Sequence, residues 1–259
     1  MAAAMPILET RALSLRIGEK QICRNLNLAV HRGERWGVLG INGVGKTSLL
    51  HTLAGLKVPL AGEVRLNGLP LAELPRRQAA LICGVMFQDS DDAFPATVME
   101  TALIGRHPHL KPWEWESADD ERIVRAALHA VGLDAMTQRS THTLSGGERR
   151  RLALAALLTQ DPDLFLLDEP VNHLDLHHQI DTLDLLTQQV AQQGKTLLMV
   201  LHDVNLAARY CDFLLLLFGD GETLQGPVDE ILNEANLQRL YRHPVRSVDA
   251  GDRKLYYPA

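Results

Sequence analysis

The 259-residue sequence predicts an α/β fold with three parts: an antiparallel β subdomain, a core sheet and an inserted α-helical subdomain. Three observations predict it. Two segments near the N-terminus alternate apolar and polar side chains, as half-buried strands do. Later apolar runs of four to six residues have the length and texture of buried strands. Between two of these runs, residues 89 to about 160 carry helical patterns, so we expect them to be inserted into the core.

Composition limits the class of protein. An apolar content of 46% and a charged content of 22% are ordinary for a globular chain that buries a core. A net charge of −6 argues against binding a nucleic acid backbone. Cys23, Cys83 and Cys211 form no Cys-x-x-Cys pair, which fits a reducing cytoplasm. No apolar stretch approaches the ~20 residues that span a bilayer, so membrane association is expected to go through a partner.

The first strands are predicted at residues 7–17 and 22–30, joined by a turn at Gly18-Glu19-Lys20. Residues 35–39 have the apolar texture of a buried strand, and a helix is expected from Ser48 to about Leu56. Between them lies a glycine-rich loop.

That loop, Gly40 to Thr47, reads G-x-x-x-x-G-K-T in the context of strand, loop and helix. Its glycines let successive N–H groups point at one anion, and the helix N-terminus adds partial positive charge. Lys46 is expected to reach the outer phosphates and Thr47 to ligate Mg²⁺. The pattern predicts a nucleoside triphosphate site; the alternative is a simple glycine-rich turn before a helix.

Further elements follow in order. We expect a strand and turn at 62–69, a buried strand at 81–87, and helices at 97–104 and 117–131. A final strand and hairpin at 212–226 and two short helices up to about residue 242 come later, and residues 243–259 are expected to form a short extended appendage.

The stretch Leu144-Ser145-Gly146-Gly147-Glu148 precedes an apolar helical run. Ser145 is a good N-cap and Glu148 occupies the matching capping-box position. One interpretation is a well-capped helix. The other is a second anion-binding helix N-terminus, where two glycines allow close approach to phosphate. The motif alone leaves both open.

Leu164 to Asp168 is an apolar strand that ends in two carboxylates, Asp168 and Glu169. Asp168 is expected to hold the Mg²⁺ that Thr47 also ligates, and Glu169 to act as the base for an attacking water. This strand, downstream of a phosphate loop and soon after Gly146-Gly147, favours the nucleotide interpretation for both motifs.

Taken together, these motifs resemble the ATP-binding subunit of an ATP-binding-cassette (ABC) transporter, from about Leu8 to Tyr241. The resemblance implies a P-loop NTPase (RecA-like) core, an ABC domain over 7–242 with the helical subdomain at about 89–160, and a C-terminal extension at 243–259. The matching motifs are residues 40–47 for Walker A, Gln88 for the Q-loop, 144–148 for the signature, 164–169 for Walker B, Asp175 for the D-loop and His202 for the switch histidine.

The resemblance implies a head-to-tail homodimer, in which ATP on one Walker A loop is covered by Ser145, Gly146 and Gly147 of the other copy. Glu169 would polarise water, with His202 holding the γ-phosphate; a histidine satisfied at a strand end is the alternative. The implied residues are Glu169 and His202 for catalysis; Gly40, Asn42, Gly43, Gly45, Lys46, Thr47, Ser48, Gln88, Ser145, Gly146, Gly147, Glu148, Asp168 and Asp175 for ATP; and Thr47, Gln88 and Asp168 for Mg²⁺.

The chain departs from the family pattern in places. The family usually has an aromatic residue that stacks on adenine near positions 15–19, where Arg16 and Ile17 must serve here. Val171 stands where Thr or Ser is common. His173 and His177 raise the alternative of a metal site, but no carboxylate or thiol at ligand spacing supports it.

Gly105-Arg106-His107-Pro108-His109 is similar to the Gly-Arg-x-Pro-His of the ABC subgroup that imports ferric siderophores, haem and cobalamin. This resemblance implies an ATP-hydrolysing translocase subunit on the cytoplasmic face of the inner membrane. Its expected partners are transmembrane permease subunits and, indirectly, a periplasmic or extracellular substrate-binding protein, with no nucleic acid. An ABC ATPase with another cargo, or one of iron–sulfur assembly type, is the alternative.

The permease is expected to dock beside the segment after Gln88, where Phe94, Pro95, Trp113 and Trp115 offer apolar surface. Alternatively, the two tryptophans pack the core of the helical insertion.

Overall fold

The structure is a computed structural model that describes residues 5–88, 96–251 and 253–259. Its central sheet contains the strands β4 (Arg35–Gly40), β7 (Cys83–Met86), β8 (Leu164–Asp168), β9 (Thr196–Val200), β10 (Phe213–Leu217) and β11 (Thr223–Pro227). Within the described residues the strand order is β11-β10-β4-β9-β8-β7, with β11 antiparallel and the others parallel. β8 and β9 are buried throughout, as their unbroken apolar sequences require in a parallel sheet covered on both faces.

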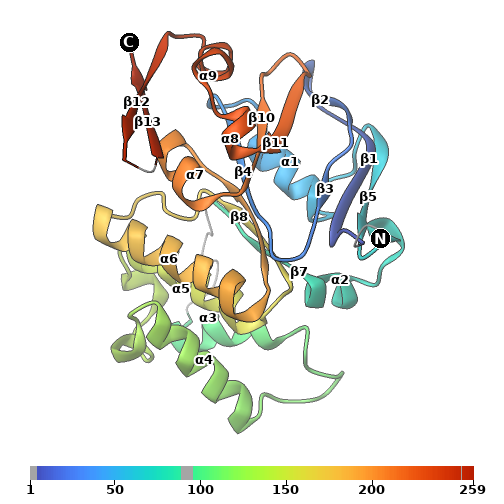
Figure 1. The fold of residues 1–259 in the computed structure, drawn as a ribbon. Coiled ribbons are helices and arrows are strands. Elements are labelled where there is room, and N and C mark those ends of the chain that lie inside the picture. The colour runs from blue at the N-terminus through green and yellow to red at the C-terminus, as the bar shows by residue number, and fades with distance from the viewer. Residues whose placement is uncertain (1–4, 89–95, 252) are drawn as a thin grey trace.

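A second, antiparallel sheet confirms the predicted strands near the N-terminus and lies to the right in Figure 1. Its strands are β1 (Leu8–Ile17), β2 (Lys20–Leu26), β3 (Ala29–Val30), β5 (Ala61–Leu66) and β6 (Leu69–Pro70). The helix α1 (Lys46–Leu53) joins the two sheets, because Leu49 and Leu53 share one apolar cluster with Ile7 and Leu166. The phosphate loop therefore leads into a helix that packs against both sheets.

The helices α3 (Val98–Leu103), α4 (Ala118–Ala130) and α5 (Gly146–Gln160) pack on one another at the bottom of Figure 1. Each begins with a capping box, in which the N-cap hydroxyl and the acidic residue three positions later exchange hydrogen bonds with each other's backbone N–H. The 3₁₀ turn η2 (Ile104–Arg106) packs closely against α5, since a Cβ added to Gly105 would lie 2.2 Å from the carbonyl oxygen of Ala156. The division of the chain into domains at about 89 and 160 stays a prediction.

Among the other helices, α6 and α7 lie beside the central sheet in Figure 1. The remaining helices and 3₁₀ turns of the described residues are η1 (Leu71–Glu73), α2 (Arg76–Ile82), η3 (Asp134–Met136), η4 (Thr141–Thr143), α6 (Leu176–Gln193), α7 (Val204–Tyr210), α8 (Val228–Ile231) and α9 (Glu234–Tyr241). The strand predicted at 81–87 is shorter than expected: Leu81 and Ile82 end α2, and β7 begins at Cys83.

The C-terminal residues form a hairpin of β12 (Val245–Ala250) and β13 (Arg253–Pro258), not a simple extended appendage. Asn205 on α7 fixes this hairpin: its side chain accepts a hydrogen bond from the N–H of Tyr256 at 2.8 Å and donates to the carbonyl of Tyr256 at 3.1 Å. The Tyr256 hydroxyl donates to the carbonyl of Leu232 at 2.6 Å, so the hairpin packs on the body of the protein.

Trp113 and Trp115 are 99% and 86% exposed, so the alternative that they pack the core of the helical insertion is wrong. Phe94 and Pro95, the other residues of the predicted docking surface, lie outside the described residues.

The close approach of η2 and α5 leads to a stability prediction. Gly105→Ala should lower the free energy of unfolding by about 1–3 kcal/mol, because the new methyl group meets backbone rather than a movable side chain. Thermal melting measures the change. Ala126→Ser, an exposed change on α4, is the matched control and should leave the melting temperature within about 2 °C. Equal melting temperatures for the two variants would contradict the packing argument.

Candidate functional site

The phosphate loop connects β4 to α1 and needs glycine at two positions. Gly43 and Gly45 have φ values of +68° and +110°, in the region that side chains disfavour. A Cβ on Gly45 would also lie 2.5 Å from Ile22 Cδ1. The loop therefore turns tightly under the β1–β2 hairpin and exposes Asn42 and Gly43.

Lys46 lies at the start of α1, buried beneath this loop. Its ammonium donates to the carbonyl of Gly40 at 2.8 Å. Burial lowers the pKa of Lys46, while the carboxylates of Glu169 and Asp168 oppose that shift. The ammonium thus lies at the strand end among the residues expected to bind phosphate. The Ser48 hydroxyl, in contrast, is buried and accepts a hydrogen bond from Lys57 at 3.0 Å.

Asp168 ends β8 with its carboxyl group fully buried. Within the described part of the chain, neither of its carboxylate oxygens accepts a hydrogen bond of normal geometry. Burial raises its pKa, and the charge of Glu169 adds to the shift, while the nearby Thr47 hydroxyl opposes it. Leaving a buried carboxylate without a partner is costly, and a hard divalent cation bound through oxygen atoms removes that cost. The oxygen donors of Asp168 and Thr47 therefore fit Mg²⁺.

Glu169 lies beside Asp168 and is held on both carboxylate oxygens. Its Oε2 accepts hydrogen bonds from the side-chain amides of Gln88 at 3.0 Å and Asn172 at 2.9 Å. Its Oε1 is hydrogen-bonded to His202 Nε2. Glu169 also has a φ of +52°, a left-handed backbone that is uncommon for a residue with a side chain.

The structure thus brings together Gln88, Glu169 and His202, which follow or lie near the ends of β7, β8 and β9. The carboxyl ends of parallel strands meet at one edge of a sheet, where open α/β folds bind ligands. Sequence reasoning missed Asn172 as a hydrogen-bond donor to Glu169. Its position three residues after Glu169, within a turn closed by the Asn172 N–H and the Glu169 carbonyl, is the signal that could have found it.

The predicted capping box at Ser145 is confirmed. The Ser145 hydroxyl accepts from the N–H of Glu148 at 3.2 Å, and Glu148 Oε2 accepts from the N–H of Ser145 at 2.6 Å. This pairing lowers the pKa of Glu148. Ser145 and Gly146 are exposed, and a Cβ on Gly146 would meet no atom within 4 Å. The fold of a single chain therefore does not explain why residue 146 is a glycine.

Asp175 is the N-cap of α6 and lies exposed, where it accepts from the N–H of His178 at 2.9 Å. His178 Nδ1 contacts the same carboxylate at 2.8 Å, and His177 pairs with Asp181 at 3.3 Å. Among the described residues, no three side chains of His, Cys, Asp or Glu are grouped to hold a metal ion.

Arg16 and Ile17, the predicted contacts for adenine, are exposed at the end of the β1–β2 hairpin. The same hairpin touches the phosphate loop, because Lys20 Nζ donates to the carbonyl of Gly43 at 2.6 Å. Sequence reasoning treated Lys20 only as a turn residue. Whether Arg16 or Ile17 contacts a base stays a prediction.

No helix within the described ranges is long and apolar enough to cross a bilayer.

Comparison with known proteins places the chain in a family. The family model described as ABC transporter matches residues 23–172. The petrobactin import ATP-binding protein of Bacillus anthracis is 37% identical over 91% of this chain and 86% of its own length. The achromobactin transport ATP-binding protein of Dickeya dadantii is also 37% identical, over 94% of this chain and 91% of its own.

Solved structures agree. A metal-chelate type ABC transporter in an inward-facing conformation has a TM-score of 0.85 at 25% identity, covering 98% of both chains. A dimeric bacterial ABC transporter cassette has a TM-score of 0.74 at 25% identity, covering 85% of this chain and 98% of its own. From the strand-edge geometry and these matches together, we conclude that the chain belongs to the ATP-binding proteins of the ABC transporter family, which are ATPases coupled to transport.

Proposed function

We propose that this chain binds and hydrolyses ATP to drive the import of an iron–siderophore or haem, with cobalamin as a related cargo. The observation that carries the proposal is the hydrogen-bonded group of Gln88, Glu169 and His202, which lies beside the buried carboxylate of Asp168. The import of petrobactin and the transport of achromobactin by similar proteins support the class of cargo.

In the proposed reaction, Lys46 and the N–H groups of residues 40–47 bind the phosphates. Thr47 and Asp168 would hold Mg²⁺, with Gln88 as a further predicted ligand, and the ion would supply positive charge that neutralises the phosphates. Glu169 accepts a proton from the attacking water. His202 fixes the orientation of the Glu169 carboxylate through Oε1, while Gln88 and Asn172 do so through Oε2.

The signature motif supports a site shared between two copies. The 15-residue helix α5 begins at Gly146, where its N-terminus is exposed and has the partial positive charge that favours an anion. A Cβ on Gly147 would lie 3.4 Å from Leu174 Cδ2, and one on Gly146 would have no atom of the described residues within 4 Å. Close approach by the triphosphate of a second copy accounts for both glycines, and Asp175 would lie near the seam of this homodimer.

An apolar groove beside Gln88 is the proposed docking site of the permease. Two adjoining cavities of about 780 and 500 Å³ share Ala80, Val85, Phe87 and Gln160 in their walls. Large apolar side chains at their rims are exposed, among them Val58 at 91% and Ile104 at 67%. Contiguous exposed apolar surface of this kind marks a protein interface. Attachment to the cytoplasmic face of the membrane would then depend on the permease.

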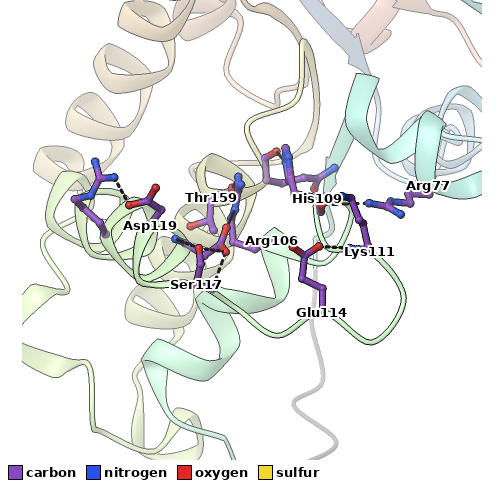
Figure 2. Close-up of polar contacts among 11 residues, drawn as sticks. Arg77, Arg106, His109, Lys111, Glu114, Ser117, Asp119 and Thr159 are labelled. Atoms are coloured by element: carbon purple, nitrogen blue, oxygen red, sulfur yellow. Dashed lines mark hydrogen bonds and ion pairs between the residues drawn. The ribbon is translucent and has the colours of Figure 1, made fainter.

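Trp113 and Trp115 are exposed on the segment between His109 and Ser117, and Figure 2 shows the polar contacts of that segment. Arg77 on α2 donates to the carbonyls of Pro108 at 2.8 Å and His109 at 3.1 Å, and Pro108 also lines the second cavity.

The tip of the turn is closed by Glu114, which accepts from the N–H of Lys111 at 2.7 Å. Cytoplasmic loops of membrane proteins carry an excess of Lys and Arg, which are attracted to tryptophan faces and to acidic residues such as Glu114 and Glu116.

Replacing the proposed base tests the ATPase. Glu169→Gln should lower the rate of ATP hydrolysis by about 10²–10⁴-fold, because the amide cannot accept the proton of water. The hydrogen bonds from Gln88 and Asn172 can persist, so the variant should accumulate as an ATP-bound dimer on sizing chromatography with Mg²⁺. Glu121→Gln, an exposed change on α4, should behave as the wild type. A Glu169→Gln variant that stays monomeric would contradict the shared site.

A charge placed on the signature glycine separates folding from function. Gly146→Asp should keep or slightly raise the melting temperature, because an acidic residue in the first turn of a helix is favourable. The same charge would repel the triphosphate of the second copy, so hydrolysis should fall by more than about 100-fold. Gly146→Asn, of equal size but uncharged, should retain more activity. Equal loss in both variants would indicate that size, not charge, decides.

The turn that carries Trp113 and Trp115 can be tested separately. The double variant Trp113→Ser, Trp115→Ser should melt like the wild type and hydrolyse ATP normally in isolation, since both side chains are exposed. With the permease in proteoliposomes, transport and pull-down of the permease should weaken about tenfold or more. Arg122→Ser, an exposed change on α4, is the matched control. Undiminished binding in the double variant would remove the turn from the interface.

A further inference from the structure

Arg150, near the start of α5, links the signature helix to the opposite side of the site. Its guanidinium is buried and donates to four backbone carbonyls. Nη1 donates to Phe87 at 2.5 Å and to Gln88 at 2.7 Å, and Nη2 donates to Asp168 and Glu169. One side chain therefore joins α5 to the end of β7 and the end of β8.

These carbonyls belong to the residues that hold the reacting carboxylate. Gln88 donates through its side chain to Glu169, so the guanidinium fixes the backbone on both sides of that hydrogen bond. Glu169 has a left-handed backbone, which is strained for a residue with a side chain and persists only where its surroundings hold it. The hydrogen bond from Arg150 to the carbonyl of Glu169 is one such restraint.

The neighbouring arginines make different contacts. Arg149 donates to the carbonyl of Leu144 at 2.9 Å, and Arg151 donates to that of Val131 at 2.9 Å, so both bond within the helical part. The planar guanidinium offers five donors in a fixed fork, which lets Arg150 span two strand ends at once. An ammonium is a point donor on a flexible stem and cannot reproduce that fork.

We propose that Arg150 is a positioning residue that couples the two ATP sites of the dimer. The inference rests on the proposed head-to-tail function, in which the N-terminus of α5 faces the triphosphate of the second copy. Binding there moves or fixes α5, and Arg150 transmits that position to Gln88 and Glu169 in its own site. Each site then holds its base more firmly in the orientation for hydrolysis when the other site is filled.

The test compares steady-state ATP hydrolysis in full-length wild type, Arg150→Gln and Arg150→Lys. Arg150→Gln should lower kcat by about 10–100-fold, because misplacing a base by about 1 Å costs up to that factor. The affinity of the monomer for a fluorescent ATP analogue should change less than about twofold. The Hill coefficient for ATP should fall from near 2 toward 1, and Arg150→Lys should recover part of kcat but not the cooperativity.

Arg151→Gln is the matched control, because it removes an arginine bonded only to the helical part in the described structure, and it should retain kcat and the Hill coefficient. If Arg150→Gln does not fold, Arg150→Lys decides the matter by the same Hill coefficient. An unchanged Hill coefficient in a folded Arg150 variant would overturn the proposal. If Glu169→Gln forms the ATP-bound dimer on sizing chromatography but the wild type has a Hill coefficient of 1, only the coupling is overturned. If Glu169→Gln forms no such dimer, the proposed head-to-tail function itself is overturned.

Discussion

The parallel pairing of β4, β9, β8 and β7 is the constraint on which the rest of the structure depends. Because the strands run the same way, their carboxyl ends meet at one edge, and residues distant in sequence become neighbours there. The phosphate loop follows β4, and Gln88, Asp168 and His202 follow or end the other strands. The sheet can be this regular because both faces are covered by apolar packing, which leaves its edge free for chemistry.

Charge at this edge is arranged unevenly. Asp168 is buried, and its oxygens accept no hydrogen bond of normal geometry from the described residues, whereas Glu169, next to it, is hydrogen-bonded on both oxygens. The first arrangement suits a carboxylate that meets a cation, and the second suits one whose orientation must be kept. Lys46 lies near both, with its pKa lowered by burial. Asp168 and Glu169 thus have the same carboxylate chemistry in different surroundings, which is why different roles are proposed for them.

Several surface features are not explained by packing among the described residues. Gly146 has open space around it, Val58 and Ile104 rim a groove, and two tryptophans stand in solvent on a firmly anchored turn. The exposed apolar side chains leave apolar surface in water, and the glycine lacks a side chain where there is room for one, so neither feature stabilises the fold. They are the features on which the proposed contacts with a second copy and with the permease rest, and Arg150 lies buried between the signature helix and the strand ends.

The sequence by itself determined the class of fold, the phosphate loop, the carboxylate strand and the signature helix start. These features depend on short-range patterns, namely the spacing of glycines, runs of apolar residues and capping residues. Each pattern acts through residues that are close together in the sequence. Only the tertiary structure decided that Asn172 and Gln88 share an oxygen of Glu169, that Lys20 touches the phosphate loop and that Arg150 spans two strand ends. The structure also corrected the prediction for the C-terminal residues, which form a docked hairpin, and it showed that the side chains of both tryptophans are exposed. Such contacts join residues many positions apart, and no local spacing encodes them, because the sheet order that creates them is set by packing of the whole core.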